Sequence, residues 1–259
     1  MNDVSPEDPI DDRPMPLLDH LIELRTRLLW SVVAFFVAFA ISYHFAGQIY
    51  LFLVDPLAKI MKARGEQPHL IYTALTEAFL TQVKVALFTA AFVSFPIVAI
   101  QIWLFVAPGL YRSEKRVLAP FLLATPALFV LGASLAYYVV FPMAWKFFLS
   151  FQSMGGGPGG VQIQLQAKVS EYLALVMKLI FAFGVAFELP VVLTLLAKVG
   201  IIDSAALRKF RRFAYVGMFG LAALITPPDA ISMCSLAAPL VVLYEVSILC
   251  ARLVEPKVV

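Results

Sequence analysis

Charge is scarce in this chain of 259 residues. Only 14% of the residues are charged, whereas 61% are hydrophobic. A soluble domain carries roughly 25% charged and about 45–50% apolar residues. So large an apolar excess cannot be buried inside one core of this length, so the sequence predicts a protein embedded in a lipid bilayer. The net charge of +3 is too small to indicate binding to nucleic acid.

The chain also lacks the residue patterns that carry most catalytic chemistry. Its three histidines are dispersed, and no GxSxG element, HExxH element or nucleotide-binding loop occurs. Its two cysteines, Cys234 and Cys250, lie in one apolar segment without CxxC spacing, so neither a disulfide framework nor a metal site is supported. We therefore expect neither an enzyme nor a bound cofactor.

Long, continuous apolar runs take the place of the alternating pattern that barrel strands would show, which favours an all-α membrane protein. We predict six transmembrane helices, at about residues 28–45, 79–105, 117–140, 172–197, 213–225 and 231–249. The last two spans are short, and the fifth covers only some 20 Å of a hydrocarbon layer that is roughly 30 Å thick. No internal repeat is visible, which argues against transporters built from inverted repeats.

The segments outside these spans are predicted to be tails, loops and one amphipathic helix. Residues 1–16 are acidic and proline-rich, unlike a cleavable signal peptide, and we expect a disordered tail there. Residues 17–27 carry leucines at helical spacing and lead into the first span, so the membrane domain covers 17–253. The remaining segments are expected as a loop at 46–77 with a short helix around 49–61, a loop at 139–170 that contains GGGPGG, and a tail at 254–259.

The distribution of basic residues predicts the orientation in the membrane. Of the 20 Lys and Arg residues, thirteen fall on the side of the two termini, five on the opposite side and two, Lys84 and Lys178, within spans. The richer side faces the cytoplasm under the positive-inside rule. Both termini and the short loops at 108–116 and 198–212 are therefore expected in the cytoplasm.

Four short elements resemble the TatC family, the multi-spanning receptor subunit of the twin-arginine protein translocase. They are HLIELRTRL at 20–28, FVAPGLYRSEKR at 105–116, FGVAFELP at 183–190 and LITPPD at 224–229. They occur in the family's order within the six-span frame, and the resemblance covers about residues 16–253. One departure is Met233, which stands where many relatives carry a polar residue, often Gln.

The resemblance implies a receptor and core scaffold for the export of folded proteins, driven by the proton-motive force. Its substrates would carry signal peptides with two adjacent arginines. Its expected partners are TatA-like and TatB-like single-span subunits, docked against the fifth and sixth spans. The resemblance further implies hetero- and homo-oligomers in the bacterial inner (cytoplasmic) membrane, with both termini in the cytoplasm.

The same resemblance implies the residues that read the signal peptide. Glu23 and Glu114 would pair with the two guanidinium groups, because carboxylates bind arginine in a bidentate, charge-assisted geometry. The expected surroundings are Leu21 and Leu24 as an apolar wall, Phe105 and Tyr111 packed against the peptide, and Arg25 beside them. The alternatives are an i,i+4 pair of Glu23 with Arg27, worth about 0.2–0.5 kcal/mol, and a simple topology anchor at Arg25.

Glu188 is the acidic residue that stands out within the fourth span. A carboxylate at membrane depth is costly and indicates a function, either facing the passing substrate or as the coupling acid of a proton-driven small-solute transporter, our alternative hypothesis. A neutral, hydrogen-bonded carboxyl group is the structural alternative. Pro190 is expected to kink this helix. The other expected turn residues are Pro56, Pro227, Pro228 and Asp229.

Overall fold

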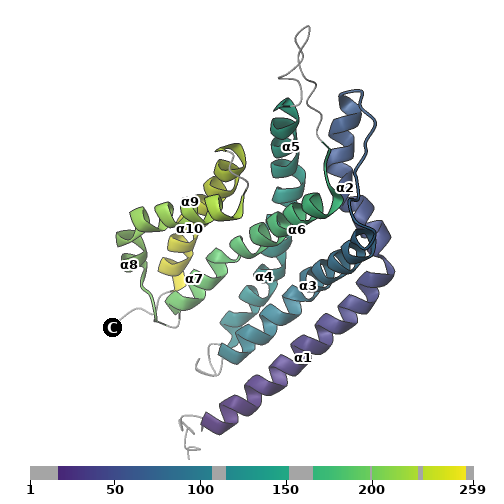
Figure 1. Cartoon of the computed structure of the whole chain (residues 1–259). Helices are drawn as coiled ribbons and strands as arrows, with labels where there is room; N and C mark the ends of the chain where they lie inside the picture. Colours follow the sequence, from purple (N-terminus) through teal and green to yellow (C-terminus); the bar gives the residue numbers. More distant parts are fainter. Residues whose placement is uncertain (1–16, 107–114, 152–165, 199, 227–229, 255–259) are drawn as a thin grey trace, which may run out of the picture.

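A computed structural model describes residues 17–106, 115–151, 166–198, 200–226 and 230–254 of the chain (Figure 1). The helices are α1 (Leu17–His44), α2 (Ala46–Ala63), α3 (Glu77–Val106), α4 (Lys115–Leu135), the π-helical η3 (Ala136–Val140), α5 (Phe141–Ser150), α6 (Val169–Ala186), α7 (Leu189–Lys198), α8 (Ser204–Lys209), α9 (Arg211–Ile225) and α10 (Ala230–Val254). Within the described ranges the only β-pairing is one isolated bridge. The all-α class is therefore confirmed.

Five stretches of the described residues are long and apolar enough to cross a membrane. They lie in α1, in α3, across α4–η3–α5, across α6–α7 and in α10. The segment expected as the fifth span is α9, whose 15 residues rise only about 22 Å at 1.5 Å per residue. The count of six spans therefore stays a prediction.

The amphipathic segment and the first span form one continuous helix, α1, which packs along α3 over most of its length (Figure 1). Most of its large apolar side chains, including Leu28, Trp30 and Phe36, point away from the protein and are exposed. An apolar surface of this kind is stable only in hydrocarbon or against another helix. The outer face of α1 thus fits a lipid-facing position.

The centre of the molecule is the tight contact between α4 and α6. Gly132 on α4 lies so close to α6 that a Cβ atom there would stand 2.4 Å from the carbonyl oxygen of Phe183. Gly184 on α6 lies equally close to the ring of Phe129, where a Cβ atom would stand 2.6 Å from Cε2. Phe129 is fully buried and stacks on Phe95 at 3.9 Å between ring centroids. The two glycines therefore let the helices approach closely enough to enclose this aromatic cluster.

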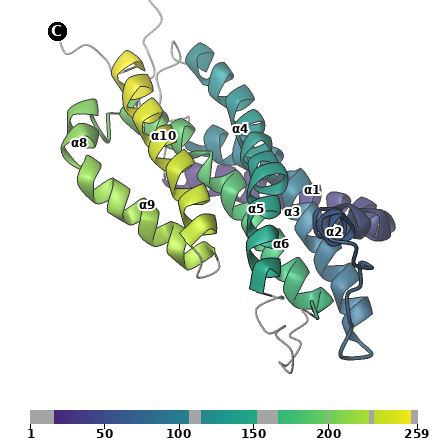
Figure 2. The ribbon, with the colours of Figure 1, turned by 90° about the horizontal axis from the view of Figure 1, so that it is seen from above.

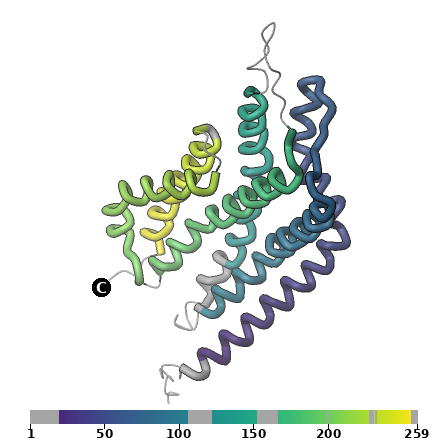
Figure 3. The backbone as a smooth tube through the Cα atoms, viewed as in Figure 1, coloured from purple at the N-terminus to yellow at the C-terminus, as the bar shows by residue number. Residues whose placement is uncertain are grey.

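The third predicted span ends ten residues later than the sequence indicated, so the expectation of a loop from residue 139 onward was wrong. The helix continues through η3 into α5, as the unbroken tube in Figure 3 shows. Pro142 lies in the first turn of α5 and has no N–H to donate, which coincides with the change to π-helical bonding just before it. The extension is stabilised because Phe141, Trp145 and Leu149 form a buried stripe.

Helix α2 is longer than the short helix expected at 49–61, and it contains Pro56 in its interior rather than at a turn. Proline cannot donate the hydrogen bond to the carbonyl group four residues earlier, which belongs to Phe52. The hydroxyl group of Tyr137 donates to that carbonyl oxygen at 2.8 Å, and its ring stacks on Phe52. Tyr172 likewise donates to the carbonyl oxygen of Leu53 at 2.9 Å. Two buried tyrosines thus anchor α2 where its own bonding is interrupted.

The chain between α2 and α3 is tied to the start of α6. Ile71 pairs with residues 167–169 in the isolated bridge, and the carboxylate of Glu77 accepts hydrogen bonds from the backbone N–H groups of Thr73 at 2.8 Å and Ser170 at 3.2 Å. The carboxylate therefore joins the starts of two helices.

The predicted fourth span is divided into α6 and α7 at residues 187–188, and α8 lies within the loop expected at 198–212. Helix α10 packs against α7 on one side and α9 on the other. Seen from above, α8 and α9 form an outer edge of the molecule (Figure 2).

Candidate functional site

The start of α1 and the end of α3 form a polar contact at one end of the molecule. Arg27 donates from Nε at 2.9 Å and from Nη2 at 2.5 Å to the same oxygen, Oε1, of Glu23. Its Nη1 also donates to Oε1 of Gln101 on α3 at 3.3 Å. Both members of the ion pair are partly buried. The i,i+4 pair considered above is therefore present, and it is fixed in place by a neighbouring helix.

Aromatic stacking holds the same two helices together one turn away. The rings of His20 on α1 and Phe105 on α3 lie parallel with their centroids 4.3 Å apart. Leu21, Leu24 and Arg25 are exposed on the other sides of α1. The structure thus brings Phe105 and Glu23 to one end of the α1–α3 pair and leaves an apolar surface beside them.

The remaining members of the predicted peptide site, Tyr111 and Glu114, fall outside the described residues, and their roles stay predictions. The same holds for the turn residues Pro227, Pro228 and Asp229. The described part of the site is therefore the α1–α3 half, centred on Glu23.

Glu188 lies at the break between α6 and α7, where it is only 5% exposed. Neither of its carboxyl oxygens has a hydrogen-bond partner among the described residues, although Thr125 of α4 lies beside the carboxyl group. Thr125 in turn accepts a hydrogen bond from Trp103 Nε1 of α3 at 3.3 Å. Three helices thus contribute a row of polar groups within the apolar interior, and Pro190 stands in the first turn after the break.

A second acidic residue within an apolar segment, Glu245 of α10, was missed by the sequence reasoning. Its Oε2 accepts from Arg211 Nη2 at 2.6 Å, and its Oε1 accepts from the hydroxyl group of Tyr215. Both partners lie on α9, so the network fixes α9 against α10. The argument applied to Glu188, that a carboxylate in an apolar run requires a reason, would have found Glu245 as well.

Lys178, one of the two basic residues within the predicted spans, reaches from α6 to α9. Its Nζ donates to the carbonyl oxygen of Leu224 in the last turn of α9 at 3.3 Å. Lys178 therefore links α6 to the last turn of α9. Within the described residues, no group of three His, Cys, Asp or Glu side chains is arranged to hold a metal ion.

These features define a multi-spanning α-helical membrane protein. The family model described as Sec-independent protein translocase protein (TatC) matches residues 19–239. The chain is 47% identical to the Sec-independent protein translocase protein TatC of Magnetococcus marinus, over 95% of this chain and 87% of that protein. It is 45% identical to the protein of the same description from Rickettsia prowazekii, over 92% of each.

Comparison with a solved structure also indicates the TatC family. The crystal structure of the twin-arginine translocase receptor TatC superposes with a TM-score of 0.75 at 36% identity, covering 89% of this chain and 98% of that one. The chain belongs to the TatC family. It is therefore a protein-transport component of the membrane and not an enzyme.

Proposed function

We propose that this protein is the receptor and core scaffold of a twin-arginine translocase, and that Glu23 reads an arginine of the signal peptide. The observation that carries the proposal is the geometry of the Glu23–Arg27 pair. Both hydrogen bonds that Arg27 donates to Glu23 end on Oε1, and Oε2 accepts none from the described residues, which leaves it for a second guanidinium group. Charge-assisted pairs of this kind are stronger where solvent is partly excluded.

The surroundings of Glu23 suit a peptide that is basic at one position and apolar beyond it. Leu21 and Leu24 are exposed beside the carboxylate, and the stacked rings of His20 and Phe105 form a firm wall. Glu114 would supply the second carboxylate from the loop after α3. Arg25 lies on the exposed surface of α1, where it takes part in the peptide site or anchors the orientation in the membrane.

Helix α9 is the surface we assign to single-span partner subunits of the TatA and TatB type. It is too short to cross the bilayer alone, and Val216 and Leu224 are exposed along it. Gly217 and Gly220 have open space where a side chain would stand, so a second helix can approach closely. Such docking would build the hetero- and homo-oligomers expected for the translocase.

The proposed location is the bacterial cytoplasmic membrane, with both termini in the cytoplasm and the proton-motive force as the source of energy. The excess of basic residues on the terminal side supports this orientation. Family membership favours protein export over the small-solute transporter, since the relatives are protein translocase subunits. Glu188 is then a polar group that faces the export path rather than the coupling acid of a carrier.

The test is the binding of a twin-arginine signal peptide to the purified protein in nanodiscs, compared with a twin-lysine peptide. Glu23→Ala and Glu114→Ala should each weaken the arginine peptide roughly ten- to a hundredfold, because a lost charge-assisted bond costs about 1.5–3 kcal/mol. Glu171→Ala, which removes an exposed glutamate at the start of α6, serves as the matched control and should bind normally. Equal binding of both peptides to the wild-type protein would refute the receptor assignment.

A further inference from the structure

The corner where α8 meets α9 is strongly basic and exposed. Arg208 and Lys209 end α8, and Arg211 and Arg212 begin α9. Glu245 neutralises Arg211 at 2.6 Å. Arg208, Lys209 and Arg212 are exposed to the surroundings. Three exposed cationic side chains therefore lie close together in sequence at the junction of α8 and α9.

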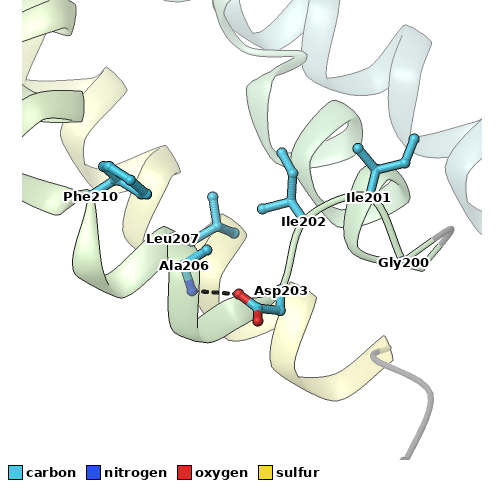
Figure 4. A pocket seen from close by; sticks show the side chains of 7 residues that line it. All are labelled: Gly200, Ile201, Ile202, Asp203, Ala206, Leu207 and Phe210. Carbon is cyan, nitrogen blue, oxygen red and sulfur yellow. Dashed lines mark hydrogen bonds between the residues drawn. The ribbon is translucent and has the colours of Figure 1, made fainter.

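The carboxylate of Asp203, which is close in sequence, is engaged with the backbone of α8 and forms no ion pair with the three cations among the described residues. Oδ1 of Asp203 caps α8 by accepting from the N–H group of Ala206 at 2.5 Å (Figure 4). Among the described residues, Arg208 donates only from Nε, to the carbonyl oxygen of Ser204 at 3.3 Å, so its remaining N–H groups are available for another acceptor. The corner thus presents donors and positive charge outward.

Large apolar side chains lie directly among the cations. Phe210 is 54% exposed and Phe213 is 59% exposed, and the guanidinium group of Arg212 lies 4.8 Å from the ring centroid of Phe213. Ile201, Ile202, Leu207 and Phe210 line a surface pocket of about 470 Å³ next to them (Figure 4). A soluble surface rarely combines exposed aromatic rings with several basic residues, whereas the membrane interface favours this combination.

The corner is also held in a fixed position. Tyr244 of α10 donates from its hydroxyl group to the carbonyl oxygen of Leu207 in α8 at 2.9 Å. The Arg211–Glu245 pair fixes the start of α9 to the same helix. The cations and rings are therefore presented on a preformed scaffold, which lowers the entropic cost of binding a ligand.

We propose that the α8–α9 corner, residues 200–213, binds the headgroup of an anionic phospholipid. Arg208, Lys209 and Arg212 hold the phosphate group, while Phe210 and Phe213 rest on the glycerol and upper acyl region. The occupant is a lipid rather than a soluble anion because the apolar helix α9, the predicted fifth span, begins at the corner. A lipid bound here places the start of the short α9 at the headgroup layer.

The test measures retention of phosphatidylglycerol and phosphatidylcholine by the full chain in detergent, using native mass spectrometry. R208Q/K209Q/R212Q should lower the affinity for phosphatidylglycerol at least tenfold, since each basic group near an anionic surface is worth about 1 kcal/mol, or about fivefold. K59Q/K62Q/K146Q removes three exposed lysines elsewhere and should retain the lipid as the wild type does. Equal retention by the two triple variants overturns the proposal.

Two further variants distinguish lipid binding from the binding of a soluble anion and from a loss of folding. F210S/F213S keeps every charge and should weaken phosphatidylglycerol several-fold without changing the binding of inorganic phosphate. R208K/R212K keeps the charge and should retain the lipid, and all variants should still bind the signal peptide, which reports on folding. If inorganic phosphate displaces the lipid fully, or if F210S/F213S has no effect, the corner is a soluble-anion site and the lipid assignment is wrong.

Discussion

Glycine has different roles in the α4–α6 contact and on the outer helix α9: it is tightly packed in the first and faces open space on the second. Gly132 and Gly184 are in contact with α6 and Phe129, and any added atom would collide. Gly217 and Gly220 on α9 have nothing within 4 Å of an added Cβ atom. The first pair completes the packing inside one chain, and the second leaves room for a helix from another. A glycine in a membrane helix is therefore informative only once its neighbours are known.

The largest effect is expected from removing the aromatic ring at the centre of the contact. Phe129→Ala should lower the free energy of unfolding by about 3–5 kcal/mol, because it leaves a cavity among rings that cannot collapse. Phe213→Ala is the matched control on α9 and should stay within about 0.5 kcal/mol. Denaturant titration in detergent measures the free energy of unfolding of both variants. Equal losses would mean that the α4–α6 contact and the surface of α9 contribute alike to stability.

Adding one methyl group at the glycine of α4 should have the next largest effect. Gly132→Ala places Cβ against a backbone oxygen that cannot move aside, so we expect a loss of about 2–3 kcal/mol and a lower melting temperature. Thermal unfolding followed by circular dichroism gives the shift. An unchanged melting temperature would mean that α4 and α6 are farther apart than described.

The tyrosine that bonds to α2 offers a smaller, more local test of the packed region. Tyr137→Phe keeps the ring but leaves the carbonyl group of Phe52 without its donor, and should cost about 1–2 kcal/mol. Tyr138→Phe removes an exposed hydroxyl group from the adjacent residue and should change little. Should both variants unfold alike, the bond to α2 contributes nothing measurable.

The smallest effect, and one of opposite sign, is expected on α9. Gly217→Ala should stabilise the isolated protein by up to about 0.5–1 kcal/mol, because alanine favours a helix and the added atom meets open space. Gly217→Leu should be folded equally well but should recover less single-span partner on co-purification from membranes. Full recovery with Gly217→Leu would count against α9 as the docking surface.

Hydropathy predicted the helical class and most helix positions, because apolar runs must be helical in a bilayer. It missed α5, since the glycine-rich stretch farther along made the whole segment resemble a loop, while burial of Phe141 and Trp145 against other helices decided the outcome. The contact of Arg27 with Gln101 joins residues distant in sequence, and no local pattern reports it. The sequence indicated Glu23 because the motif around it resembles that of a known family. It did not indicate Glu245 because no such motif surrounds that residue.

The bond between Tyr137 and the carbonyl group of Phe52 has a consequence for how this family evolves. We expect selection to act on Pro56 and Tyr137 as a pair, since the hydroxyl group supplies a donor to the carbonyl group that proline leaves without its backbone donor. A relative that replaces the proline regains that donor and tolerates phenylalanine at the tyrosine position. The two positions should therefore change together across the family, in the order proline first and tyrosine second.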